Sequence, residues 1–140
     1  MINSIAIVKK VIDTSREDLF EAFSNPEIMS KWFYPYDDMW VEVSNTFQVG
    51  GEYVLRIHNK DDDVFIHEGE YREIVPPEKL VFTWNSALVQ NTVVTIEFIE
   101  LDSGTEITLT HELLPTEEEV ERHKAGWASV LNRLEGNMPS

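Results

Sequence analysis

The chain has 140 residues, with 26 Asp and Glu, 11 Lys and Arg and no Cys. This length suits one folded domain whose core needs no disulfide or metal, so we expect residues 1–140 to form a single domain. The formal net charge of −15 argues against binding to nucleic acid or to anionic lipid, and the lack of cysteine excludes disulfides and thiolate metal sites.

The amino-terminal residues 1–15 lack the long apolar run of a signal peptide. Nowhere does the chain approach the ~20 consecutive apolar residues that span a bilayer. We therefore expect a cytoplasmic protein, a monomer or homodimer, with neither nucleic acid nor a membrane as its partner.

Residues 2–13 are rich in β-branched side chains and indicate a first strand. Two short helices are expected to follow it. Thr14 or Ser15 can cap the first helix, and its apolar residues recur at helical spacing. Asn25 followed by Pro26 marks the start of the second helix. The apolar face of that second helix would consist of Ile28, Met29, Trp32 and Phe33.

Six more segments have the alternating pattern of antiparallel strands with one apolar face. They are residues 39–45, 49–60, 64–75, 79–85, 91–101 and 105–113. Three aspartates at 61–63 mark a hairpin tip, and Pro76 and Pro77 end one strand because proline cannot donate to a ladder.

A long helix is expected at the carboxy terminus. Thr116 can cap it, with Glu119 three residues further on, and Gly136 can end it. It is the only element long enough to cover the apolar face of the sheet. The expected fold class is α+β: a curved antiparallel sheet of about six to seven strands wrapped around this helix. A helix cannot fill a concave sheet along its whole width, so we expect a cavity between them.

Aromatic side chains and two histidines gather on the faces expected to point inward. Tyr71 and Trp84 flank the double-proline corner, so both can lie on the concave face. The aromatic set could line a ligand cavity or could form ordinary core. The candidate cavity residues are Trp32, Phe33, Tyr53, Phe65, His67, Tyr71, Phe82, Trp84, His111 and Trp127.

His67 and His111 have two possible roles. A buried neutral imidazole can orient a polar ligand group or act as a base, but it can equally be a core side chain with protein partners. A metal site built from them with Glu68 or Glu112 is disfavoured, because neighbouring strand residues point to opposite faces. We assign no catalytic residue, no metal and no cofactor.

Four stretches, in chain order, resemble the SRPBCC or START-like superfamily, in the group related to the activator of the heat-shock protein 90 ATPase. They are TSREDLFEAFSNPEIMSKWF, GGEYVLRI, GEYREIVPPEKLVFTW, and SGTEITLTHELLP followed by GWASVLNRL. The resemblance implies a helix-grip, or START-like, fold in a single-domain bacterial-type member. Eukaryotic co-chaperone members carry an additional amino-terminal domain that engages the chaperone, and we expect this chain to lack that domain.

The resemblance implies three kinds of function, because this fold alone does not determine one. We favour a module that binds a hydrophobic small molecule between sheet and helix. The first alternative is a co-chaperone-like protein of the stress response, with a chaperone as its partner. The second is a cyclase-type or hydrolase-type enzyme that uses a cavity histidine as general base.

Overall fold

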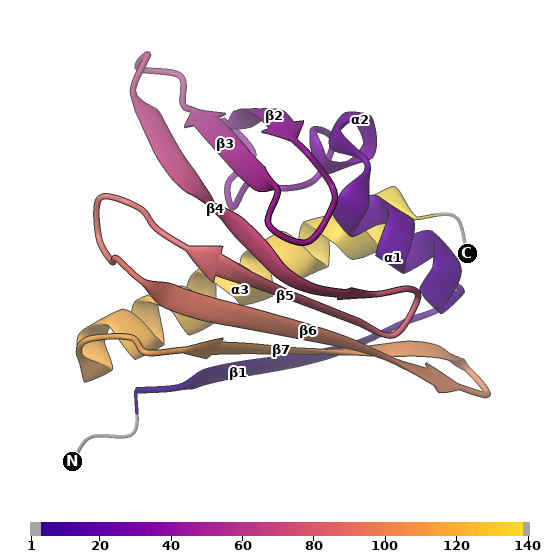
Figure 1. Cartoon of the computed structure of the whole chain (residues 1–140). Coiled ribbons are helices and arrows are strands. Elements are labelled where there is room, and N and C mark those ends of the chain that lie inside the picture. Colours follow the sequence, from indigo (N-terminus) through magenta and orange to yellow (C-terminus); the bar gives the residue numbers. More distant parts are fainter. Residues whose placement is uncertain (1–3, 139–140) are drawn as a thin grey trace.

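The computed structural model describes residues 4–138 (Figure 1). Its first part contains β1 (Ala6–Ile12), α1 (Arg16–Ser24) and α2 (Pro26–Met29). Six strands and the long helix follow: β2 (Trp40–Asn45), β3 (Glu52–His58), β4 (Val64–Val75), β5 (Lys79–Trp84), β6 (Thr92–Leu101), β7 (Gly104–Glu112) and α3 (Glu117–Asn137).

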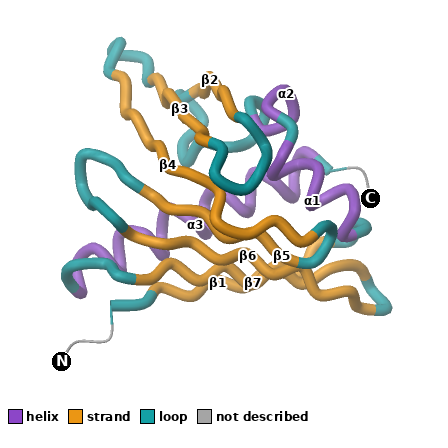
Figure 2. Tube along the Cα trace, viewed as in Figure 1, coloured by secondary structure: helices purple, strands orange, loops and turns teal. Residues whose placement is uncertain are grey.

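The seven strands form one antiparallel sheet in the order β1-β7-β6-β5-β4-β3-β2. The first strand pairs with the last, and each of the others pairs with its neighbour in sequence. Figures 1 and 2 show the sheet curling around α3, with α1 and α2 beside the helix. The predicted fold, a curved sheet gripping a carboxy-terminal helix after two short helices, is confirmed.

The predicted helix starts are also correct. Ser15 accepts a hydrogen bond from the backbone N–H of Asp18 at 3.2 Å, and Thr116 does the same for Glu119 at 3.1 Å. Asn25 caps α2 by accepting from the N–H of Glu27 at 2.9 Å. These caps satisfy amide groups that have no partner inside a helix, so short polar residues fix where each helix begins.

Two predicted helix ends are wrong. The second helix stops at Met29, and the chain continues as an irregular segment through Trp32 and Phe33. Consecutive residues on a helix point about 100° apart, whereas here both side chains are buried, stacked with ring centroids 4.8 Å apart. At the other end, α3 continues through Gly136, and the backbone N–H of Met138 caps it by bonding to the carbonyl of Glu135.

The core lies between the concave face of the sheet and the helices. Helix α3 runs across this face closest to β1, where Lys10 and Glu135 form an ion pair at 3.1 Å (Figure 1). Five of its residues are buried against the core: Val120, Trp127, Val130, Leu131 and Leu134. Within residues 4–138, none of the helices has both the length and the apolar character that crossing a lipid bilayer requires.

The corner between β4 and β5 brings the central aromatic residues onto the concave face. Pro76 and Pro77 lie between these strands, as expected. Tyr71 on β4 pairs directly with Phe82 on β5, and Trp84 lies two residues further along the same face. All three side chains are buried. Strand alternation therefore predicted their direction correctly.

Candidate ligand-binding site

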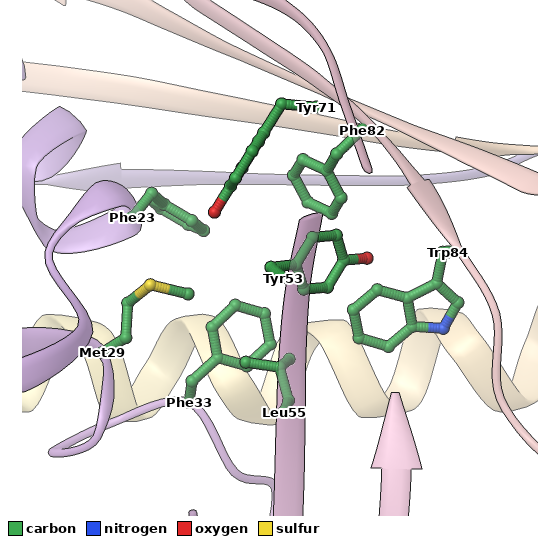
Figure 3. Close-up of a pocket in the computed structure, with 8 residues that line it drawn as sticks. All are labelled: Phe23, Met29, Phe33, Tyr53, Leu55, Tyr71, Phe82 and Trp84. Atoms are coloured by element: carbon green, nitrogen blue, oxygen red, sulfur yellow. The ribbon is translucent and has the colours of Figure 1, made fainter. Parts of the chain in front are cut away.

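The interior between α3 and strands β3 to β5 contains a small pocket walled by apolar side chains (Figure 3). Its walls come from both short helices, from the segment that follows them and from the three strands. The residues that line it are Phe23, Met29, Phe33, Tyr53, Leu55, Tyr71, Phe82 and Trp84. Figure 3 shows these side chains converging on one space in front of α3.

The pocket has a volume of about 10 Å³, which is room for about one water molecule. Pockets that hold drug-sized ligands are typically 300–1,000 Å³. The expectation of an open cavity is therefore wrong for this conformation. The protein's own side chains occupy the space. The centroid of the Phe33 ring lies 6.3 Å from that of Trp84 and 5.7 Å from that of Trp127.

The structure buries nine of the ten candidate residues fully or partly, in three groups. Five of them line the pocket: Phe33, Tyr53, Tyr71, Phe82 and Trp84. Trp32, Trp127 and His111 are buried outside its wall, and His67 lies partly buried against Trp84.

Phe65 is a correction to the candidate set. It has the predicted inward register, since it pairs with the buried Ile57, but its side chain is 44% exposed. It lies at the start of β4, next to the β3–β4 hairpin tip, which Figure 1 shows projecting away from α3. The direction of the side chain was right, but nothing covers that end of the sheet among the described residues.

Three wall residues are missing from the predicted set: Phe23, Met29 and Leu55. The prediction favoured aromatic strand residues, whereas these come mostly from apolar helix faces. Leu55 alternates with Tyr53 along β3, so its inward direction was readable from the sequence. How close the helix residues come to the strands depends on how α1 and α2 pack, which the sequence pattern does not give.

The two tyrosine hydroxyls in the wall have protein partners. Tyr53 donates to the backbone carbonyl of Thr83, and the side-chain amide of Asn45 donates to the Tyr71 hydroxyl at 3.0 Å. Burial raises the pKa of both phenols, that of Tyr53 well above its usual value. Both groups are therefore neutral at physiological pH, and they fix the orientation of the two rings.

His111 uses both of its ring nitrogens inside the protein. The indole N–H of Trp127 donates to Nδ1 at 3.0 Å, so Nδ1 has no proton. In the neutral ring Nε2 then carries the proton and donates to the hydroxyl of Thr92 at 2.8 Å. That hydroxyl donates in turn to the backbone carbonyl of Trp84 at 2.7 Å. Burial, with help from the charge of His123, lowers the pKa of His111 to about 3. These contacts favour a structural role.

His67 has a different environment. Its ring lies 4.9 Å from the Trp84 ring, and burial, followed by the charge of His123, lowers its pKa to about 4. Within residues 4–138, neither Nδ1 of His67 nor Nε1 of Trp84 has a hydrogen-bond partner. The backbone of Phe65 also acts on the ring and raises the pKa of His67, but no contact of hydrogen-bond geometry reaches either of the two buried nitrogens within the described chain.

Across the part of the chain that the structure describes, no group of three or more His, Asp or Glu residues is arranged to hold a metal ion. His111 has committed both nitrogens to Trp127 and Thr92, which leaves it no lone pair to offer a metal.

The curled antiparallel sheet and the helix that it grips define the helix-grip class of proteins. A family model described as "Activator of Hsp90 ATPase homolog 1-like protein" matches residues 13–138, and the chain belongs to this family. This membership supports a ligand-binding or co-chaperone-like module as the general kind of function.

Solved structures show the same fold. A protein from Chromobacterium violaceum is similar with a TM-score of 0.87 and 23% identity, over 95% of each chain. The AHSA1-like protein from Aeromonas hydrophila has a TM-score of 0.82 and 19% identity, over 95% of this chain and 90% of its own. A protein from Cytophaga hutchinsonii has a TM-score of 0.75 and 26% identity, over 96% and 94%. No curated protein matches the chain.

Proposed function

We propose that this chain is a small-molecule binding module whose apolar, ring-bearing ligand enters the space between α3 and strands β3 to β5. The observation that carries this proposal is the eight-residue apolar pocket in that interior, to whose wall an irregular segment contributes Phe33. In this account the ligand takes the place of Phe33. We also place the module in the cytoplasm, which a cysteine-free sequence supports.

The segment of residues 30–39, here called the Phe33 segment, contacts α3 through polar groups as well as through the packing of Phe33 on Trp127. Arg133 donates to the backbone carbonyl of Tyr34 at 3.0 Å and pairs with the carboxylate of Asp37. Asp37 is 97% exposed, and exposed ion pairs contribute little stability. Ser129 adds one hydrogen bond to the carbonyl of Pro35. Such contacts can exchange with water, so the segment can withdraw and remove Phe33 from the interior.

Calorimetric titration with naphthol-sized aromatic compounds tests this function. We expect the wild-type protein to bind such a compound, and Phe33→Ala to bind it at least about tenfold more tightly because no side chain has to be displaced. Phe20→Ala is the matched control. It removes an equally buried ring that packs on Phe98 at 5.5 Å and lies outside the pocket wall. Equal affinities for wild type and Phe33→Ala, or an equal gain in Phe20→Ala, would count against the proposal.

A second candidate function is protein interaction of the co-chaperone kind. It is favoured by two exposed apolar residues on the outer face of the sheet at the start of β4, namely Val64 and Ile66. Trp40, also exposed, stacks on His58 at 3.9 Å, and His58 pairs with Val64. If this surface engages a chaperone of the heat-shock protein 90 type, adding the protein should change the chaperone's ATPase rate, and Ile66→Ser should remove the change. An unchanged rate with the wild-type protein would argue against this function.

A further inference from the structure

Trp84 differs from the other buried tryptophans in its hydrogen bonding. The indole N–H of Trp32 donates to the carbonyl of Ala22 at 3.2 Å, and that of Trp127 donates to His111 at 3.0 Å. The indole N–H of Trp84 is equally buried, with only 6% of the residue exposed, and it has no acceptor among residues 4–138. Buried donors almost always have a partner, so this one indicates a position where an external acceptor fits.

A second unused polar atom lies beside it. His67 on β4 packs against Trp84 on the neighbouring strand β5, with ring centroids 4.9 Å apart. Nδ1 of His67 is buried and likewise without a partner in the described chain. Two neighbouring strands therefore present one indole donor and one imidazole nitrogen, and we call these two atoms the His67–Trp84 pair.

The pair adjoins the aromatic pocket. In Figure 3 the six-membered ring of Trp84 points toward the pocket, and its nitrogen lies on the opposite side of the indole. His67 is partly exposed, so the pair lies between the pocket and the protein surface. A ligand whose apolar ring packs along Trp84 would bring a polar substituent to this position.

Charge near the pair favours an uncharged substituent. His67 is neutral at pH 7, because burial lowers its pKa to about 4. Two groups from α3 lie nearby: His123, whose charge acts on His67, and Glu119, which lies 3.5 Å from Nδ1 of His123. Arg122, on the same turn, is already paired with Glu119 at 3.2 Å. The protein's net charge of −15 would repel an anion, and Arg122 is not free to offset that repulsion.

We propose that the His67–Trp84 pair binds an uncharged oxygen, a hydroxyl or carbonyl, on the apolar ligand. This inference rests on the proposed function. In either case the indole N–H of Trp84 donates to the oxygen. When Nδ1 is unprotonated, it accepts a hydrogen bond from a ligand hydroxyl. When Nδ1 carries the proton, it donates to a ligand carbonyl. The pair therefore selects phenols, alcohols and ketones over hydrocarbons, carboxylates and ammonium ions of the same shape.

Four probes with one ring system test this selectivity: naphthalene, 2-naphthol, 2-naphthoate and 2-naphthylmethylammonium, titrated calorimetrically at pH 7. We expect 2-naphthol to bind about tenfold more tightly than naphthalene, which is the size expected from one or two added hydrogen bonds. His67→Leu should lower the affinity for 2-naphthol toward that of naphthalene, because only the bond from Trp84 remains. His58→Leu, a histidine on the opposite face of β3, should leave the preference intact.

Indole proton resonances provide a readout on the unmodified protein. When 2-naphthol binds, the N–H resonance of Trp84, assigned with Trp84→Phe, should move strongly downfield as it gains an acceptor. The resonances of Trp32 and Trp127 should move little, because their N–H groups already have acceptors. Naphthalene should not produce the downfield shift of Trp84.

The outcomes separate this inference from the function on which it rests. Equal binding of naphthalene and 2-naphthol, with an unmoved Trp84 resonance, would overturn the His67–Trp84 pair but leave the small-molecule module standing. Tighter binding of the carboxylate or the ammonium probe would also overturn the inference. If none of the four probes binds to wild type or to Phe33→Ala, both proposals fall.

Discussion

Histidines 67 and 111 lie on neighbouring parts of one interior, yet their contacts assign them different roles. His111 is fully buried and bonds through both nitrogens, to Trp127 and to Thr92. His67 is partly exposed, and its Nδ1 is left without a partner within residues 4–138. Residue type alone could not separate them. Hydrogen bonding makes His111 part of the core and leaves His67 as the residue that can meet a ligand.

The lowered pKa of His67 predicts a pH dependence of stability. A histidine in an unfolded chain has a pKa near 6.5, whereas burial first, and then the charge of His123, lowers the pKa of His67 to about 4. Between these values the unfolded chain takes up a proton that the folded chain does not, so acidification favours unfolding. We expect wild type to lose about 2 kcal/mol more than His67→Gln between pH 7.5 and pH 4.5.

Urea unfolding of both proteins at the two pH values measures this difference. Comparing the proteins at each pH cancels the effect of the many carboxylates, which titrate in both. The additional loss of stability in wild type, relative to His67→Gln, should be absent above pH 7 and should grow as the pH falls. Identical losses in wild type and His67→Gln would show that His67 is not the buried neutral group described here.

At the scale of elements, the contact between the Phe33 segment and α3 sets how readily the interior opens. The guanidinium of Arg133 lies 4.6 Å from the centre of the Tyr34 ring, in addition to its contacts with the Tyr34 carbonyl and Asp37. One side chain therefore makes three attachments to the segment. The segment has no strand or helix of its own, so these attachments hold it in place together with its buried rings, Trp32 and Phe33.

Removing Arg133 should loosen the Phe33 segment without unfolding the protein. We expect Arg133→Met to lower the free energy of unfolding by about 1–2 kcal/mol and to speed hydrogen exchange of the amides in residues 30–39. Asp37→Asn should have a much smaller effect, because that carboxylate is exposed and keeps only a surface ion pair. Unchanged exchange in Arg133→Met would show that the segment is held by its buried rings instead.

Strand β5 leaves no room for a side chain at Gly69 on β4. A Cβ atom placed there would lie 2.1 Å from the carbonyl oxygen of Thr83, which is the acceptor for the Tyr53 hydroxyl. We expect Gly69→Ala to cost at least about 2 kcal/mol and to displace Tyr53 from the pocket wall. Gly126→Ala on α3 is the control. A Cβ there would meet nothing within 4 Å, so helix propensity should raise stability by up to about 1 kcal/mol. Thermal unfolding of the two variants measures these changes in stability, which should have opposite signs.

For the whole molecule, local rules predicted the fold well and the site only in part. Strand alternation gave the inward direction of Tyr53, Tyr71 and Trp84, and polar caps gave the helix starts, because both depend on near neighbours in sequence. The filling of the interior depends instead on how an irregular segment folds back over a distant helix. Phe33 and Ser129, 96 positions apart, belong to segments joined by the bond from Ser129 to Pro35. No periodic pattern contains that information.

The same limit explains why the sequence did not predict the exposure of Phe65 or the small volume of the pocket. Alternation places Phe65 on the concave face, but whether a face is covered depends on the length and path of α3. The sequence also predicted space beneath the helix from the general shape of such folds. Six pocket-lining aromatic rings, together with Met29 and Leu55, leave only about 10 Å³ of that space.

The central claim is that a small molecule can occupy this interior, and nuclear Overhauser contacts between 2-naphthol and protein methyl groups test it most directly. The account predicts contacts from the ligand ring to the methyls of Met29 and Leu55, which lie in the pocket wall. Contacts confined to the exposed methyls of Val64 and Ile66, or no contacts at all at saturating ligand, would contradict it.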